Sequence, residues 1–318
     1  MTDLGPNRWT HPAVILVATD LTDLERLMTF AMGQASETGA RLILLHVLPG
    51  GGSMAVDAVG MPYYDPVGAI EFAAKTLEPW CTMARERNII CDALVREGNA
   101  AQQIAASVRQ FQADRILLGT RSRSKVSKLL LGSVAEQVLR SVNLPVITVG
   151  PEAHLPVGSS GGEKVVLHAT TLREASRPSA ALACHIAAVQ QARLVLLHVL
   201  PPIDEMERGG LPTGLASTAL HELRNLAAAV GTTECGCPVH VEPLVVHGNP
   251  SIEILATSVE QRASLIVLGA THRSALQNLT RDRTIYRVLA HAHCPVLTLH
   301  EPMAQESNGQ PEKLVTQI

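Results

Sequence analysis

The chain has 318 residues, a net charge of −3 and 46% hydrophobic residues, which excludes a long disordered chain and predicts about two domains. Aromatic residues make up 3%, which disfavours nucleic-acid modules that stack bases on exposed aromatic side chains. No general basic field, signal-peptide pattern or long apolar run is present, so neither a nucleic-acid nor a membrane partner is expected, and the predicted location is cytoplasmic.

The first half of the sequence alternates short apolar runs with helical patterns. Runs typical of parallel strands covered on both faces predict strands at 14–19, 42–48, 90–95, 115–119 and 145–149. After the first of these, Thr22 and Glu25 have the spacing of a capping box. Pro79 is expected to kink or split the next helix. The long glycine-rich segment 50–68 predicts either a surface excursion or a lid.

The second half repeats the first. The segment Arg41–Pro49 reads RLILLHVLP and recurs at Arg193–Pro201 as RLVLLHVLP, and four further segments match in the same order at offsets of 150 to 152 residues. This pattern indicates the tandem duplication of a domain-sized unit. The corresponding strands are predicted at 165–169, 194–200, 239–246, 265–269 and 295–299, with a second glycine-rich loop at 202–215.

The alternation of strands and helices predicts an α/β fold with two tandem doubly wound domains, each a five-stranded parallel sheet. The Gly-, Pro- and Ser-rich stretch 150–162 has the composition of a linker. We therefore expect a first domain at 1–150, a second at 151–300 and a flexible tail at 301–318.

The segment after the strand at 115–119 carries the strongest functional signal. Ligands of open α/β sheets bind beyond the carboxyl ends of the strands. Gly119 begins the segment, and Gly132 with Ser133 opens a helix in which Ser133 and Glu136 have capping-box spacing. Between them stand four basic residues and no acidic one: Arg121, Arg123, Lys125 and Lys128. The pattern suits phosphate binding at a helix N-terminus, and it is equally consistent with a solvated basic loop.

With these residues the chain resembles the universal stress proteins in their tandem two-domain form, over about 14–150 and 165–300. The resemblance also rests on Ala18-Thr19-Asp20, on Leu45-His46-Val47 and on the closing strand PVITV from Pro145. The nucleotide-binding branch of that family carries the motif G-x2-G-x9-G-S/T. Here the motif positions hold Gly119, Ser122, Gly132 and Ser133, so a serine replaces the second glycine. Its β-carbon restricts the backbone, while its hydroxyl can donate to a phosphate.

The resemblance implies that the first domain binds ATP or a related adenine nucleotide, alone or with Mg²⁺. By position, Asp20 and Gly119 would hold the ribose, and the backbone of Val47 would recognise adenine. Thr19 would line the pocket. The phosphates would be surrounded by Arg121, Ser122, Gly132, Ser133 and Val134.

The second copy departs from this pattern. Thr171 replaces the carboxylate after the first strand, and Thr171 and Glu174 have capping-box spacing. Gly269 is retained, but His272 stands at the second glycine and Asp282 at the third. A carboxylate at Asp282 would repel phosphate, so the second domain is expected to have a degenerate site without a nucleotide.

Family members commonly pair through their last strands, which implies an intramolecular pseudo-dimer with its seam between 145–149 and 295–299. Such a seam would cover strand edges that are otherwise open. The alternative is that both are ordinary edge strands and that the chain forms a homodimer elsewhere.

The histidines and cysteines predict no metal centre. Neither His291-x-His293-Cys294 nor the Cys235–His240 segment has a second ligand pair at zinc-finger spacing. His46 and His198 recur inside apolar strands and are expected to be hydrogen-bonded core histidines. Six cysteines are too few for a disulfide scaffold of this length, which favours a reducing compartment.

Three functions follow from these observations. The first is a stress-response regulator that binds an adenine nucleotide without dedicated catalysis and is read by a protein partner. The second is a nucleotide-independent stress protein that acts through protein contacts. The third is a slow ATPase, which the lack of a Walker A sequence and of acidic residues beside the basic segment disfavours.

Overall fold

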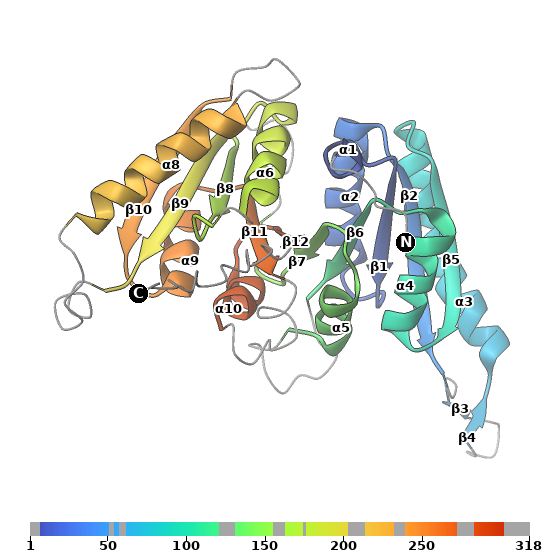
Figure 1. Ribbon diagram of the computed structural model, residues 1–318. Coiled ribbons are helices and arrows are strands. Elements are labelled where there is room, and N and C mark those ends of the chain that lie inside the picture. Colours follow the sequence, from blue (N-terminus) through green and yellow to red (C-terminus); the bar gives the residue numbers. More distant parts are fainter. Residues whose placement is uncertain are drawn as a thin grey trace, which may run out of the picture.

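The protein is described here from a computed structural model that covers residues 7–50, 54–56, 62–120, 131–154, 163–173, 176–202, 214–231, 239–271 and 283–301. The predicted fold class is confirmed: each half of the chain forms a five-stranded parallel sheet with helices on both faces (Figure 1). Within those ranges, no helix combines the length and apolarity needed to cross a membrane.

All ten expected strands are present, and several run a few residues longer than predicted. Those of the first half are β1 Val14–Thr19, β2 Arg41–Pro49, β5 Cys91–Gly98, β6 Arg115–Gly119 and β7 Val146–Val149. Those of the second half are β8 Val165–Ala169, β9 Arg193–Leu200, β10 Val241–His247, β11 Leu265–Thr271 and β12 Val296–Glu301. The glycine-rich segment 50–68 contains an unpredicted antiparallel hairpin, β3 Met54–Val56 with β4 Pro62–Tyr64, which projects from the body in Figure 1.

Helices cover both faces of the sheet. Those of the first half are α1 Asn7–Thr10, α2 Leu24–Thr38, α3 Pro66–Glu86, α4 Ala100–Phe111 and α5 Ser133–Ser141. Those of the second half are α6 Arg177–Val189, α8 Leu215–Gly231, α9 Pro250–Glu260 and α10 Arg283–His291. One apolar core lies under α2, α3, α6 and α8, and the other under α4, α5, α9 and α10. Along β1, Ile15 and Val17 face the first core while Leu16 and Ala18 face the second, as the two-residue repeat of a strand requires.

The strand order locates the position in each half at which doubly wound folds bind ligands. The first half runs β5-β2-β1-β6-β7 and the second half β10-β9-β8-β11-β12. The direction of winding reverses between β1 and β6, and again between β8 and β11. In doubly wound folds, ligands bind at this reversal, outside the carboxyl ends of the strands.

The two halves join through their last strands. β7 and β12 pair antiparallel, with Ile147 opposite Leu297, so the halves form one ten-stranded sheet (Figure 1). The implied seam between 145–149 and 295–299 is therefore present within the chain. It converts two strand edges into one hydrogen-bonded ladder, which removes a route to association between chains.

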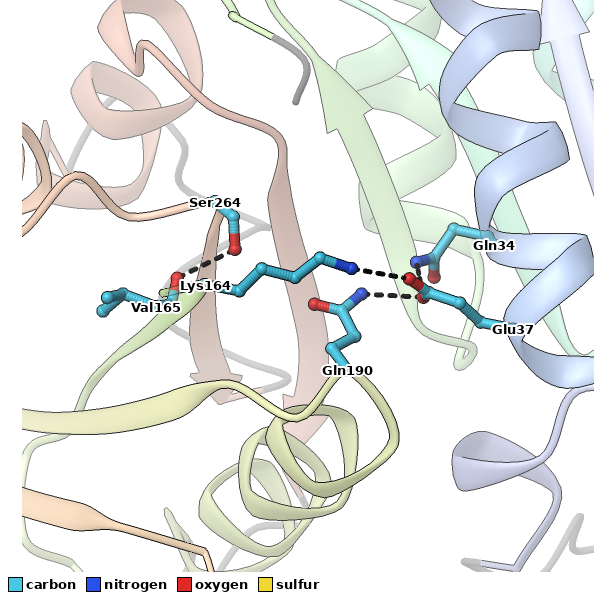
Figure 2. Close-up of polar contacts among 6 residues, drawn as sticks. All are labelled: Gln34, Glu37, Lys164, Val165, Gln190 and Ser264. Atoms are coloured by element: carbon cyan, nitrogen blue, oxygen red, sulfur yellow. Dashed lines mark hydrogen bonds and ion pairs between the residues drawn. The ribbon is translucent and has the colours of Figure 1, made fainter. Parts of the chain in front are cut away.

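A second contact between the halves is polar. Glu37, on α2, accepts hydrogen bonds from Lys164 Nζ at 3.3 Å and from Gln190 Nε2 at 2.9 Å, both from the second half (Figure 2). Gln34 Nε2 donates to the same carboxylate at 3.2 Å (Figure 2). On its other side, Gln34 Oε1 accepts from Arg115 Nη1 at 2.7 Å. A buried charge of the first half is thus linked through two side chains to the second half.

Arg115 is the largest fully buried side chain of the structure's described residues. Its Nη2 donates to the backbone oxygen of Trp9 at 2.9 Å, which attaches the segment before β1 to β6. Burial lowers the pKa of Arg115 to about 10. A cation in this position needs its acceptors, because an unpaired buried charge is strongly destabilising.

None of the three predicted capping boxes caps its helix. Asp23, and not Thr22, is the N-cap of α2, and the Thr22 hydroxyl instead donates to Asp20 Oδ1 at 2.6 Å. Gly132 is the N-cap of α5, so Ser133 is its first helical residue. In the second copy, the Thr171 hydroxyl contacts Ser176 Oγ at 3.1 Å and α6 begins only at Arg177; Glu174 lies outside the described residues.

Pro79 does not split its helix. α3 runs without interruption from Pro66 to Glu86. Leu77, Cys81 and Ala84 are buried against the sheet on either side of the proline. Tertiary packing of this face therefore outweighs the missing backbone hydrogen bond.

A recurring Gly-Asn pair starts a helix in each half. Gly98 and Gly248 have φ of 124° and 151°, in the region that favours glycine. The next residue caps the helix: Asn99 Oδ1 accepts from Gln102 N, and Asn249 Oδ1 accepts from Ser251 N, both at 3.1 Å. An asparagine cap contributes about 1 kcal/mol of helix stability, so the pair fixes where α4 and α9 begin.

Candidate functional site

A cavity of about 310 Å³ opens at the point where the first sheet reverses its winding. Its floor is formed by the carboxyl ends of β1, β2 and β6, and its sides by the first turns of α2, α4 and α5. The lining residues are Ala18, Thr19, Asp20, Asp23, Leu27, Leu45, His46, Val47, Pro49, Ala100, Ile104, Leu118, Gly119, Gly132, Ser133, Val134 and Ala135. A largely apolar wall with a few polar groups at this size is typical of a small-molecule site.

Seven of the nine predicted nucleotide-binding residues line this cavity. They are Thr19, Asp20, Val47, Gly119, Gly132, Ser133 and Val134. They come from three strand ends and one helix start that are up to 115 positions apart in the chain (134 − 19). The other two, Arg121 and Ser122, lie outside the described residues, as do Arg123, Lys125 and Lys128.

The turn after β1 positions the carboxylate. Thr19 Oγ1 accepts from Leu21 N at 2.9 Å, and Leu21 has the uncommon φ of 74°. Asp20 Oδ1 accepts from Thr22 N at 3.0 Å as well as from its hydroxyl at 2.6 Å. A left-handed leucine is an uncommon conformation, and the second half repeats it at Leu172. The hydrogen bonds from Thr22 hold the Asp20 carboxylate beside the cavity.

His46 fixes the same turn from β2. Its Nδ1 contacts Thr19 O at 2.8 Å. In the second half, His198 Nδ1 contacts Thr170 O at 2.9 Å, and Leu172 has φ 60°. The prediction of a hydrogen-bonded core histidine is confirmed for His46, which is buried and also lines the cavity, whereas His198 makes the expected hydrogen bond but is only half-buried.

The start of α5 also lines the cavity, through Gly132, Ser133 and Val134. Gly132 N donates to Thr120 O at 3.1 Å, which ties the helix start to the end of β6. Glu136 N donates to Gly132 O at 3.0 Å as the first helical hydrogen bond. The amides of the first helical turn have no acceptor within a helix and carry its positive dipole end. An anion in the cavity beside Ser133 and Val134 would meet that positive end.

Gly119 leaves room in the wall. A β-carbon at this position would lie 3.7 Å from Asp23 Oδ2 and 3.9 Å from Leu27 Cδ1, both lining residues. These are ordinary contact distances, so alanine would fit here, whereas a larger side chain would enter the space between Asp23 and Leu27. Glycine therefore keeps this part of the cavity open to a ligand.

Several lining residues were not nominated by the sequence. Asp23 and Leu27 belong to α2, and Ala100 and Ile104 to α4. Leu27 belongs to an apolar helical stripe, and that pattern does not distinguish it from the core residues of the same stripe. Ala100 and Ile104 follow the capping Asn99 at the start of α4. Because this helix begins directly after β5 and crosses over to β6, its first turns lie beside the carboxyl ends of the strands. That topological rule is the signal that could have found them.

The second half differs at the equivalent turn. Thr171 takes the position of Asp20, and its hydroxyl pairs with Ser176 at 3.1 Å. His272 and Asp282 lie outside the described residues. In the portions of both halves that are described, no three His, Cys, Asp or Glu side chains gather in a way that could hold a metal ion.

Comparison with known proteins identifies the family. A profile of the "Universal stress protein family" matches residues 13–150 and again 163–300, which together exceed half of the chain. The chain belongs to the universal stress protein family. In this universal stress protein, each matched range covers the strands of one five-stranded sheet, except that β12 extends one residue beyond the second range.

Individual relatives agree with this assignment. A universal stress protein of Thermus aquaticus is 30% identical over 139 residues, which is 42% of this chain and 96% of that protein. One from Methanocaldococcus jannaschii is 36% identical over 69 residues, 22% of this chain and 39% of that protein, so this match spans well under half of the relative. A universal stress protein of Archaeoglobus fulgidus of known crystal structure shares the fold, with a TM-score of 0.68, 21% identity and coverage of 91% of this chain and 96% of that chain.

Proposed function

We propose that the first domain binds ATP or a related adenine nucleotide in the cavity between β1, β2 and β6, and that the protein is a stress-response regulator without dedicated catalysis. The observation that carries the proposal is the convergence of Asp20, Gly119 and Ser133 on one cavity. A carboxylate that can accept from hydroxyls, a bare backbone and a positive helix end are what ribose and phosphate require.

Each part of the nucleotide has a matching part of the wall. Asp20, held through Oδ1 by Thr22, and Gly119 would contact the ribose. The backbone of Val47 would recognise adenine against the apolar side chains of Leu27 and Ile104. Gly132, Ser133 and Val134 would surround the phosphates, with Arg121 and Ser122 proposed from their positions in the sequence.

The domains at 1–150 and 151–300 would then have different roles. In the second domain, the Thr171 hydroxyl is paired with Ser176 where the first domain has Asp20. Asp282 replaces Gly132 in the sequence, and a carboxylate beside the phosphates would oppose binding. We therefore assign one nucleotide to each chain.

Calorimetric titration of ATP into nucleotide-stripped protein tests the proposal. We expect one site per chain with a Kd on the order of micromolar. Asp20→Ala and Gly132→Asp should abolish the binding heat, and the latter recreates the residue of the second copy. Thr171→Ala is the matched control at the equivalent position of the second domain and should bind as the wild type does. Absence of both heat and thermal shift at millimolar ATP would overturn the proposal.

Catalysis is tested on the same proteins. Asp20 and Asp23 are the acidic side chains among the described lining residues. Mg²⁺ is usually held by one or two carboxylates together with phosphate oxygens, so titrations with and without Mg²⁺ measure its contribution. We expect the wild type to release phosphate from ATP no faster than the Gly132→Asp variant does. Faster release by the wild type would instead identify a slow ATPase.

A second candidate, action through protein contacts, is favoured by exposed apolar side chains at the start of α3. Val67 and Ile70, three positions apart on one face of the helix, are 64% and 39% exposed, and Phe72, on a different face, is 67% exposed. Large apolar side chains left on the surface close to one another mark interaction surfaces. Sedimentation equilibrium of the wild type and of a Val67→Ser, Ile70→Ser variant tests whether the partner is a second copy of this chain. A monomer in both cases would exclude that homodimer.

A further inference from the structure

Two cysteines outside the cavity lie in direct contact. Cys81, on α3, and Cys91, the first residue of β5, have their Sγ atoms 2.8 Å apart. A disulfide bond is about 2.05 Å long, so the sulfurs need to approach by less than 1 Å to bond. Both side chains are buried between the helix and the sheet.

The surrounding contacts hold the pair in place. Arg85, one helical turn after Cys81, donates from Nη2 to the backbone oxygen of Cys91 at 2.8 Å. Its Nη1 pairs with Glu78 at 2.7 Å, which fixes the guanidinium on the helix surface. The backbone of Cys91 is thus attached to the helix that carries Cys81, so the two sulfurs stay together without a covalent bond.

The two thiols differ in acidity. The hydrogen bond with Cys91 lowers the pKa of Cys81 against the effect of burial, and the charge of Arg85 lowers it further. The hydrogen bond with Cys81, together with burial, raises the pKa of Cys91. Cys81 is therefore the thiol that ionises first and Cys91 the one that retains its proton. This is the division between an attacking and a resolving cysteine.

The remaining described cysteines are unlike this pair. Burial raises the pKa of Cys184 to about 11 and that of Cys294 to about 12. Among the four cysteines in the described ranges, the structure records a sulfur–sulfur contact for Cys81 and Cys91 alone. Cys184 and Cys294 therefore provide internal controls within the same chain.

We propose that Cys81 and Cys91 are a redox modification site, at which a hydroperoxide converts the two thiols into a reversible disulfide. The Cys81 thiolate attacks the peroxide and becomes a sulfenic acid. The Cys91 sulfur then attacks Cys81, and the hydroxyl leaves with the Cys91 proton as water. With hydrogen peroxide, two thiols and one peroxide give one disulfide and two waters, so the two electrons lost by sulfur are gained by oxygen.

Both cysteines are buried in the folded chain, so a small oxidant would reach them through local opening of this part of the sheet. β5 is the last strand at its end of the sheet, and Ile90, directly before Cys91, is 66% exposed. An edge strand with one neighbour opens locally more readily than a central one. The disulfide would attach α3 covalently to this edge.

Oxidation would be independent of the nucleotide cavity. In the pairing of β2 with β5, Cys91 lies opposite Leu42, while Gly98 lies opposite Pro49 at the far end. Pro49 lines the cavity, so the pair and the cavity occupy opposite ends of the same strands. The proposed oxidation of Cys81 and Cys91 therefore does not depend on whether the cavity binds ATP.

Peptide mapping tests the proposal on the full chain. The protein is treated with hydrogen peroxide under native conditions, alkylated and digested with trypsin without reduction. Cleavage after Lys75, Arg85, Arg87 and Arg96 gives the peptides 76–85 and 88–96, each with a single cysteine. We expect these two peptides to appear linked, two hydrogens lighter than their sum, and to separate again with dithiothreitol.

Variants and a denatured control make the test decisive. Cys91→Ala should leave Cys81 as a sulfenic or sulfinic acid, and Cys184→Ala should leave the link unchanged. Protein oxidised in guanidinium should form this link more slowly, because the unfolded chain no longer holds the two sulfurs in contact. The proposal is overturned if the folded wild type, checked by circular dichroism, keeps the two peptides separate while Cys81 is oxidised further. It is also overturned if either cysteine pairs instead with another.

Discussion

Thr148 and Thr298 donate reciprocal hydrogen bonds across the middle of the sheet. Thr148 Oγ1 donates to Val296 O at 3.3 Å, and Thr298 Oγ1 donates to Val146 O at 3.2 Å. The two threonines are 150 positions apart, the offset of the duplication (298 − 148). Both are buried, so each copy gives the other the same contact about an approximate two-fold axis.

Removing either hydroxyl should weaken the seam. We expect Thr148→Val and Thr298→Val each to lower the free energy of unfolding by about 1 kcal/mol, because each removes one buried hydrogen bond at nearly constant side-chain shape. Urea denaturation followed by circular dichroism measures the change. Thr82→Val, at an exposed position of α3, is the control. A double variant as stable as the wild type would show that the hydroxyls do not hold the halves together.

The hydrogen-bonded chain from Arg115 through Gln34 and Glu37 to Lys164 joins the two halves. Its buried end at Arg115 should contribute more to the free energy of unfolding than its exposed end at Lys164. Gln34→Leu removes the acceptor of the buried Arg115 guanidinium and should cost about 2–3 kcal/mol. Lys164→Ala removes a partly exposed ion pair with Glu37 and should cost less than about 1 kcal/mol. Denaturation curves of the two variants under the same conditions give the comparison. Equal losses would contradict the importance of burial.

His168 should make the second domain sensitive to acid. Burial lowers the pKa of His168 to about 4, and its Nδ1 contacts Val267 O at 3.0 Å. The unfolded chain takes up this proton near pH 6.5, whereas the folded chain resists it until about pH 4. Above pH 6.5, His168 is neutral in both states and costs the folded protein nothing. As the pH falls to about 4.5, the free energy of unfolding decreases by about 2–3 kcal/mol, because only the unfolded chain binds the proton.

The first copy supplies the variant that tests this. Val17 occupies the position in β1 that His168 occupies in β8. We expect His168→Val to remove this part of the acid sensitivity and to leave stability at neutral pH unchanged or higher. Denaturation midpoints measured from pH 7.5 to pH 4.5 provide the readout. The same slope in both proteins would assign the acid sensitivity to other groups.

Gly119 should control access to the cavity. Gly119→Ala places a methyl group at ordinary contact distance from Asp23 and Leu27, so fold and ATP affinity should change little. Gly119→Trp should fill the space beside those residues and reduce ATP affinity more than ten-fold, a change of over about 1.4 kcal/mol. Calorimetry measures both variants, with circular dichroism to check folding. Unchanged affinity in Gly119→Trp would place the nucleotide elsewhere.

The sequence alone predicted the duplication, all ten strands of the large sheet and the doubly wound fold class. It could do so because hydrophobic periodicity and repeats are local patterns that survive without knowledge of partners. The rule that ligands bind at strand ends then selected residues such as Asp20 and Gly119 that meet in one cavity.

Tertiary structure decided what depends on a distant partner. Thr22 has the spacing of a helix cap, yet its hydroxyl donates a hydrogen bond to Asp20. The helix α3 continues through Pro79 because its buried face packs on the sheet. The contact of Cys81 with Cys91 follows from how α3 lies on β5, which no spacing in the sequence encodes. Local patterns fix which elements form, whereas the choice among competing hydrogen-bond partners and the meeting of side chains are settled only when those elements pack.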